Sequence, residues 1–192
     1  CLEENIGYVR LTTFSNGADL QLSEAIDELM AQQPDGLILD LRDNPGGLLD
    51  QAIKVSDLFL PEGIVAFQRD NQGIERVFES EDGDQAEIIP LVVLINRGSA
   101  SASEIVAGAI RDLGRGILVG EQTLGKGSVQ QSYTLSDGSE LRVTIARWYT
   151  PNNESIDSQG ILPDIEIETP ADLGGDGDEQ LQRAIQILLG GE

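Results

Sequence analysis

Strand-like and helix-like segments alternate along the first 120 residues, and this alternation limits the fold more than any other feature. Short apolar runs, such as Leu-Val-Val-Leu-Ile at 91–95, are typical of buried strands, and apolar residues at helical spacing follow them. The expected strands are residues 6–12, 36–43, 64–68, 74–78, 90–96, 117–121, 128–135 and 140–150, and the expected helices are residues 19–32, 48–60, 103–114 and 179–189. Because strands that alternate with helices form parallel sheets, the sequence predicts an α/β core with a partly parallel sheet.

The charge balance excludes several classes of partner. Of the 192 residues, 34 are acidic and 12 are basic, which gives a net charge of −22. Such a chain repels nucleic acid and anionic lipid. No apolar run approaches the roughly 20 residues of a membrane-spanning helix, so we expect no nucleic-acid partner and no direct membrane insertion. The chain opens at Cys1 without a signal peptide, and a signal encoded upstream would leave the same sequence.

Two scarcities restrict the chemistry of any active site. The chain contains no histidine, which excludes a Ser-His-Asp triad, a Cys-His dyad and a histidine-ligated metal site. It contains only two lysines, Lys54 and Lys126. A nucleophilic serine needs a base, and a neutral lysine is the known substitute for histidine. Lys126 follows an apolar strand and lies between two glycines, where burial would favour the neutral amine, whereas Lys54 falls among polar residues on a predicted helix.

Two loops resemble ligand-binding motifs. The stretch GEQTLGKGS at 120–128 matches the start of a phosphate-binding loop, but Gly127 stands where Ser or Thr is required, and the following residues alternate like a strand. The segment DLGGDGD at 172–178 resembles a calcium loop, but its third position is Gly174 and its twelfth is Arg183 instead of Glu. We therefore expect neither a nucleotide site nor a metal site in these loops.

A serine cluster and a glycine loop supply the other groups that acyl transfer needs. Ser99, Ser101 and Ser103 lie where an apolar strand passes into a helix, whose N-terminus offers backbone amides to a developing oxyanion. The residue types alone do not distinguish among the three serines. Ser101-Ala-Ser-Glu104 also fits a capping box, which is a purely structural interpretation. The loop at 44–47, Asn-Pro-Gly-Gly, is either an ordinary turn or a place where a ligand approaches the backbone.

Four blocks of sequence, in this order and spacing, resemble the carboxyl-terminal processing peptidases, which are also called tail-specific proteases. The blocks are DLRDNPGGLLDQAI, LINRGSASASEIVAGAI, VGEQTLGKGSVQ and YTPNNESIDSQGILPDIEIE, and they span residues 40–168. The resemblance implies a serine endopeptidase with a Ser–Lys dyad. It implies an α/β fold with a crotonase/ClpP-like core, in which helices flank a mixed, partly parallel sheet, plus a β-hairpin region. It also implies that residues 1–169 are the protease catalytic core, and that residues 170–192 are a linker and the C-terminal helix of the same core.

The resemblance also assigns site roles by position. The assigned residues are the nucleophile Ser101, the general base Lys126, the lysine-orienting Gln130, and the oxyanion-hole amides of Ala102 and of a glycine, Gly47 in preference to Gly46. The implied reaction proceeds through an acyl-enzyme and needs no metal and no cofactor. A straight strand would separate the Cα atoms of Lys126 and Gln130 by about 13 Å, so contact between them needs long side chains or a bend near Gly127.

The sequence departs from this family in two places. No PDZ domain fits ahead of residue 6, and in the family that domain captures a substrate's C-terminal tail by strand addition. Leu124 stands where the family often has an aromatic residue. The alternative function is therefore a catalytically silent core that binds peptides or acts as a scaffold. The resemblance implies protein or peptide substrates with exposed C-terminal tails and an extracytoplasmic setting (periplasm, cell envelope or thylakoid lumen), and it leaves open whether the chain forms a homo-oligomer.

Overall fold

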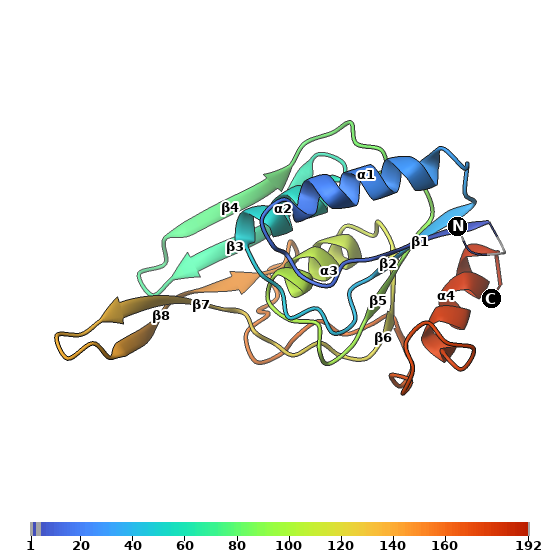
Figure 1. The fold of residues 1–192 in the computed structure, drawn as a ribbon. Coiled ribbons are helices and arrows are strands. Elements are labelled where there is room, and N and C mark those ends of the chain that lie inside the picture. The colour runs from blue at the N-terminus through green and yellow to red at the C-terminus, as the bar shows by residue number, and fades with distance from the viewer. Residues whose placement is uncertain (1, 3–4, 192) are drawn as a thin grey trace.

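Parallel strands form the central sheet of the molecule (Figure 1). The computed structural model describes residue 2 and residues 5–191. The strands of this sheet are, in spatial order, β1 (Ile6–Arg10), β2 (Gly36–Asp40), β5 (Leu91–Ile95), β6 (Ile117–Gly120) and β9 (Ile165–Glu166). All neighbouring pairs are parallel, so the carboxyl ends of the strands meet at one edge of the sheet. The loops that follow β2, β5 and β6 therefore lie together at that edge, which is where α/β folds place their ligand sites.

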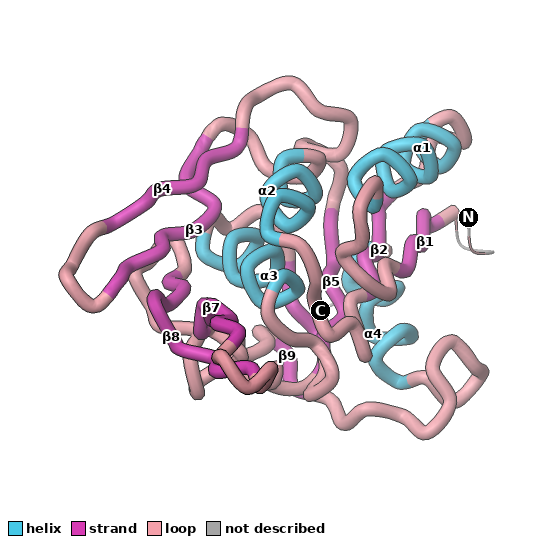
Figure 2. The backbone as a smooth tube through the Cα atoms, turned by 60° about the vertical axis from the view of Figure 1, so that its left-hand side comes forward, coloured by secondary structure: helices cyan, strands magenta, loops and turns pink. Residues whose placement is uncertain are grey.

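Helices cover both faces of this sheet, because alternate residues of a strand point to opposite sides. The helices are α1 (Ala18–Met30), α2 (Leu49–Asp57), α3 (Ala102–Asp112) and α4 (Glu179–Leu188). Leu37, Leu39 and Val93 face the core shared with α1, α2 and α3. Ile38 and Val92 face a second, smaller cluster that α4 closes. Figure 2 shows α1, α2 and α3 grouped on one side of the strands, with α4 apart from them.

A second, antiparallel sheet stands beside the first. Its strands are, in spatial order, β4 (Glu75–Ser80), β3 (Gly63–Asp70), β8 (Glu140–Tyr149) and β7 (Ser128–Thr134). Helix α3 contacts β3, and α2 contacts β4, so the same helices join the two sheets. Strand β3 pairs with residues 146–149 of β8 and leaves the start of β8 without a neighbour on that side. The far half of the β7–β8 hairpin therefore reaches away from the body of the molecule (Figure 1).

The predicted α/β class is confirmed, with parallel strands flanked by helices and a hairpin region. Each expected strand and helix forms within a few residues of its predicted bounds. The strands divide between a parallel sheet and an antiparallel sheet. Strand β9 is not among the expected strands, because the alternation of Ile165-Glu-Ile-Glu168 is only four residues long and directly follows a turn-rich stretch. The residues after Lys126 form β7 and not a helix, which removes the geometry that a phosphate-binding loop requires.

A fully buried arginine joins α4 to the end of β2. The guanidinium of Arg42 donates to the carboxylates of Asp40 at 2.7 Å and Asp178 at 2.8 Å, and all three side chains have no exposed surface. Asp178 also caps α4 by accepting from the amide of Leu181. Burial alone would raise the pKa of Asp178, but hydrogen bonds from Arg42 and from the amides of Gly174 and Leu181 hold that pKa below its ordinary value. The residue that resembled a calcium ligand is therefore part of a buried ion-pair cluster.

Candidate active site

Three loops meet at the carboxyl edge of the parallel sheet. They are the glycine loop at 44–47 after β2, the serine cluster at 99–103 after β5, and the lysine loop at 121–127 after β6. Backbone hydrogen bonds join them, because Ala100 N donates to Asn44 O at 3.0 Å and Leu124 N donates to Ser99 O at 3.1 Å. The predicted site segments, which are far apart in the sequence, are therefore neighbours in the fold.

The structure distinguishes the three serines of the cluster. Ser99 and Ser103 are fully buried, and their hydroxyls donate to the backbone carbonyls of Leu41 at 2.8 Å and Asn44 at 2.9 Å. Ser101 is instead partly exposed at the N-cap of α3. Ser99 and Ser103 therefore hold neighbouring loops together, and Ser101 is the serine that a substrate can reach.

The backbone of Ser101 is strained. Its φ is 56° and its ψ is −112°, which lies outside the regions that residues with a side chain favour. Such a conformation costs on the order of 1–3 kcal/mol and persists only where the surrounding structure enforces it. In α/β-hydrolases, a similarly strained strand-to-helix turn exposes the hydroxyl of the nucleophilic serine. The turn from β5 into α3 therefore has the geometry expected of a nucleophile position.

Gly46 brings the backbone of the glycine loop directly against Ser101, and Gly47 lies against the backbone of Phe14. Their φ values are 94° and 154°, which side chains rarely permit. A Cβ atom on Gly46 would lie 2.8 Å from the Cβ of Ser101, and a Cβ atom on Gly47 would lie 2.3 Å from the carbonyl oxygen of Phe14. Both positions require glycine for lack of space as well as for conformation. The loop therefore packs tightly against the serine turn, and its second interpretation, a place where a ligand approaches the backbone, stays a prediction.

Two backbone amides beside Ser101 donate to no acceptor within residues 5–191, and they belong to Gly47 and Ala102. The amide of Gly46, by contrast, is bound to Asn44 Oδ1 at 2.9 Å. Ala102 is the first residue of α3, where the helix dipole adds partial positive charge. These are the two amides that the sequence resemblance assigned to an oxyanion hole, whereas the amide of Gly46 already has Asn44 as its acceptor.

A buried carboxylate joins the serine turn to the lysine loop. Glu104 is fully buried, and its Oε2 accepts from the amides of Ser101 at 2.7 Å and Lys126 at 2.8 Å. Its Oε1 accepts from the amide of Gly125 and the hydroxyl of Thr123, both at 2.6 Å. Hydrogen bonds to a charged acceptor are roughly twice as strong as neutral ones. The capping box with Ser101 was visible in the sequence, but the bonds to a loop 22 residues further along were not.

Lys126 reaches the site through its backbone, while its side chain is exposed. The expectation that apolar surroundings bury this lysine is wrong for this structure. No hydrogen bond joins Lys126 Nζ to Ser101 Oγ, and no carboxylate lies within 4 Å of Nζ among the residues that the structure describes. Lys54, the other lysine, lies on α2 with its Nζ 3.4 Å from the carboxylate of Asp19. Ser101 and Lys126 thus share a site without the hydrogen bond of a dyad.

Gln130 lies on β7 and is exposed. The β7–β8 ladder is irregular at this point, because Val129 pairs with Ala146 whereas Gln130 pairs with Thr144. The extra residue on β8 is a β-bulge, which bends a strand and increases its twist. This irregularity lies on β8, opposite residues that follow Gly127 by two and three positions. No hydrogen bond joins Gln130 to Lys126 in the described part of the chain.

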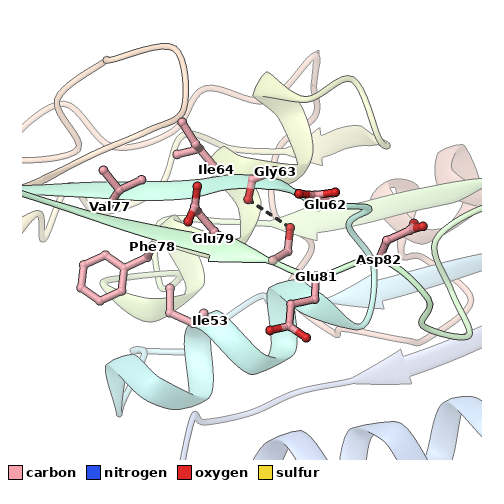
Figure 3. Close-up of a pocket in the computed structure, with 10 residues that line it drawn as sticks. Ile53, Glu62, Gly63, Ile64, Val77, Phe78, Glu79, Glu81 and Asp82 are labelled. Atoms are coloured by element: carbon pink, nitrogen blue, oxygen red, sulfur yellow. Dashed lines mark hydrogen bonds between the residues drawn. The ribbon is translucent and has the colours of Figure 1, made fainter.

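A hollow of about 810 Å³ lies elsewhere, between β3, β4 and the side of α2 (Figure 3). Carboxylates line much of it, and Ile53 reaches toward it from α2. Its one serine, Ser80, has its hydroxyl 2.6 Å from the carbonyl oxygen of Pro61 and 3.2 Å from that of Gly63, so its hydrogen bond stays within the protein. None of the predicted site residues lines this hollow. Despite its volume, the hollow is therefore not the candidate active site. The candidate site is the edge where the three loops meet, since the predicted serine, lysine and glycine residues lie there.

Comparison with known proteins agrees with the sequence resemblance. Residues 5–167 match peptidase family S41. The chain is 44% identical over 192 residues to the carboxyl-terminal-processing protease of Synechocystis sp., which covers 98% of this chain and 45% of that protein. It is 47% identical over 174 residues to the carboxy-terminal-processing protease of Bartonella bacilliformis, which covers 88% of this chain and 40% of that protein.

A solved structure extends the likeness to the fold. The photosystem II D1 C-terminal processing protease superposes with a TM-score of 0.82 at 41% identity, over 88% of this chain and 45% of that chain. The chain spans less than half the length of each of these three relatives. The family match includes the glycine loop, the serine cluster and the lysine loop. The chain belongs to peptidase family S41.

Proposed function

We propose that this chain is the catalytic core of a serine endopeptidase that cleaves protein or peptide substrates near their C-termini. One observation carries the proposal: Ser101 occupies a strained strand-to-helix turn beside two amides without acceptors. The carboxylate of Glu104 connects that turn to the loop of Lys126, so a nucleophile and a base belong to one rigid unit. The names of the relatives, which are C-terminal processing proteases, support the class of substrate.

In the proposed reaction, the neutral amine of Lys126 removes the proton from Ser101 Oγ as that oxygen attacks the scissile carbonyl carbon. The carbonyl oxygen becomes an oxyanion and accepts hydrogen bonds from the amides of Gly47 and Ala102. The lysine ammonium then protonates the leaving amine as the C–N bond breaks, which leaves an acyl ester on Ser101. Water attacks this ester with Lys126 again as the base and releases the new carboxylate. The reaction uses no metal and no cofactor.

Lys126 needs a drier environment than the one it has here, because water stabilises the ammonium form and burial disfavours it. We propose that a bound substrate covers the lysine and excludes water from it. In that closed arrangement the amide oxygen of Gln130 accepts a hydrogen bond from the amine and directs its lone pair toward Ser101. Gln130 is thus a positioning residue in this mechanism.

The compartment is a further part of the proposal and rests on the family resemblance. We propose an extracytoplasmic protein of the periplasm, cell envelope or thylakoid lumen. Within the described residues, no helix has both the length and the apolar character needed to cross a membrane.

The two lysines of the chain allow a matched test of the mechanism. Lys126→Ala and Ser101→Ala should each reduce cleavage of a protein with an unstructured C-terminal tail by at least about a thousandfold, since the base and the nucleophile act as a unit. Lys54→Ala, which removes a lysine paired with Asp19, should stay within about twofold of the wild type. Substantial cleavage by either catalytic variant would contradict the proposal.

The exposed side chain of Lys126 favours one alternative, a core that binds tails without cleaving them. A tail peptide that carries a fluorophosphonate group separates the two functions, because it covers Lys126 as a substrate would and reacts covalently with an activated serine. We expect labelling of the wild type and none of Ser101→Ala. An unlabelled wild type that still binds a tail peptide would identify the silent core instead.

A further inference from the structure

The outer edge of β7 is an unpaired strand edge that begins two residues after Lys126. In the order β4-β3-β8-β7, this strand is the last of its sheet, so one of its sides has no neighbour in residues 5–191. An unpaired edge presents a row of free N–H and C=O groups, which can pair with another extended chain. The position of this edge beside the catalytic loops raises the question of which chain it binds.

The hydrogen bonds at the near end of the hairpin reveal which groups point outward. Trp148 N donates to Gly127 O at 2.8 Å. The adjacent pair in the register is Ser128 opposite Arg147. Along an antiparallel ladder, pairs whose backbones bond each other alternate with pairs whose backbones do not. Gly127 and Trp148 form a bonded pair, so Ser128 and Arg147 form a non-bonded pair. The backbone groups of Ser128 therefore point away from β8, toward the free edge.

The far end of the hairpin gives the same result. Leu135 N donates to Ser139 O at 2.8 Å, and the adjacent pair is Thr134 opposite Glu140. Thr134 therefore also turns its backbone groups to the free edge. Alternate residues of a strand share an orientation. The residues whose N–H and C=O groups point outward along β7 are Ser128, Gln130, Ser132 and Thr134.

One face of the same hairpin is apolar and uncovered. Its side chains are between 37% and 49% exposed and belong to Tyr133, Leu135, Leu141, Val143 and Ile145. The register places Tyr133 opposite Leu141, so these side chains form one surface and not scattered contacts. The β7 residues whose backbone groups point to the free edge have polar side chains. A chain added to β7 would lay alternate side chains beside this apolar surface while its backbone pairs with the edge.

We propose that β7 binds the substrate polypeptide as an added strand that leads into the loops around Ser101. This inference rests on the proposed protease function and names how the substrate is held. The edge is continuous with the catalytic site, so a chain paired with Ser128 passes next to Lys126 and covers it. The same contact therefore supplies the burial that the lysine needs in order to act as a base. Because backbone groups make the bonds, binding tolerates many sequences and strengthens with peptide length, up to about the 7 residues of β7.

Proline tests the edge directly, because it has no N–H to donate and is tolerated on the outer side of an edge strand. Ser132→Pro removes an outward N–H from the free edge of β7. Arg142→Pro makes the matched change on the opposite side of the hairpin, since Arg142 pairs with Ser132. Both changes are made in the Ser101→Ala protein, which binds a fluorescent twelve-residue peptide without cleaving it. We expect Ser132→Pro to weaken binding roughly tenfold and Arg142→Pro to change it less than about twofold.

Modified peptides provide a second measurement that leaves the hairpin intact. Two peptides are compared, one N-methylated at its odd-numbered residues and the other at its even-numbered residues. One of them loses the N–H groups that face β7, and the other loses the N–H groups that face solvent. We expect one peptide to bind roughly tenfold more weakly than the other. Equal binding by the two peptides would overturn the proposal, and so would equal binding by folded Ser132→Pro and the parent protein.

The failure of this inference can be distinguished from the failure of the proposed protease function. Cleavage of the tail-bearing protein by the wild type, with Ser101→Ala as the inactive control, tests the protease, whereas peptide binding to the Ser101→Ala protein with and without Ser132→Pro tests the edge. A wild type that cleaves, together with a peptide affinity that Ser132→Pro leaves unchanged, keeps the protease and rules out the added strand. A wild type that does not cleave, together with a peptide affinity that falls with Ser132→Pro, rules out the protease and keeps the peptide-binding edge.

Discussion

The buried carboxylate of Glu104 accepts a hydrogen bond from the backbone amide of Lys126, with Oε2 and N 2.8 Å apart. The same oxygen accepts from the amide of Ser101 at 2.7 Å. One side chain thus sets the distance between the serine turn and the lysine loop, whether or not the side chains of Ser101 and Lys126 touch. Glu104 is a positioning residue, since it acts on the proposed reaction through the two backbones that it binds.

We expect Glu104→Gln to lower kcat much more than it raises KM. The glutamine amide replaces one acceptor oxygen with an NH₂ group, so the donors that faced this oxygen lose their partner and remain buried. Unsatisfied buried donors cost about 1–3 kcal/mol each, so we expect the free energy of unfolding to fall by about 2–4 kcal/mol. Urea unfolding measures the stability, and steady-state kinetics separates kcat from KM. Glu28→Gln, on an exposed position of α1, is the control and should change neither quantity appreciably.

The strain at Ser101 predicts a stability difference between two variants that both lack the hydroxyl. Glycine adopts a positive φ at little cost, whereas alanine keeps the strain that serine has. We expect Ser101→Gly to be more stable than Ser101→Ala by about 1 kcal/mol, as measured by the midpoint of urea unfolding. A lower stability of Ser101→Gly would show that the conformation at this residue is not strained.

Much of this fold was predictable because local pattern and tertiary packing agree. The run at β5 is apolar on both sides of the strand, and both sides are buried, one under α3 and one facing α4. The three loops of the site were predictable for a related reason, since chain order places them after successive parallel strands. The sequence alone could not identify the reactive serine among Ser99, Ser101 and Ser103. The difference is tertiary, because the hydroxyls of Ser99 and Ser103 donate to carbonyls of a distant loop.

The contacts that were not predictable join residues far apart in the chain. Arg42 and Asp178 are 136 residues apart, and neither belongs to a periodic pattern that would reveal the other. The bonds from Glu104 to the lysine loop use backbone amides, which every residue except proline has, so the sequence shows no sign of them. The sequence predicts a buried Lys126, and the structure exposes it, because its two glycine neighbours contribute no side chain to bury it.

The close approach of Gly46 to Ser101 predicts a specific loss of activity. A Cβ atom at this position would lie 2.8 Å from the Cβ of Ser101 and 2.6 Å from the carbonyl oxygen of Ala100. We expect Gly46→Ala to displace the serine turn and reduce kcat/KM by at least about a hundredfold, as a misplacement near 1 Å does. Gly73→Ala is the matched control, because Gly73 has a similar φ of 81° and no atom within 4 Å of the added Cβ. It should lose about 1 kcal/mol of stability and keep full activity.

The buried ion-pair cluster predicts how stability depends on pH. Asp178 has a folded-state pKa below its unfolded value near 3.8, because the hydrogen bonds from Arg42 and two backbone amides outweigh the effect of burial. A carboxyl group shifted in this direction stabilises the fold fully above its unfolded pKa, and the contribution is lost as the pH falls through the lower, folded value. We expect Asp178→Asn to cost about 3 kcal/mol at pH 7, since Arg42 keeps Asp40 as a partner. The difference from the wild type should shrink below about pH 4 in a series of urea unfolding curves. Asp176→Asn, at an exposed position nearby, should show almost no difference at any pH, and a gap for Asp178→Asn that stays constant down to pH 2 would contradict the assignment.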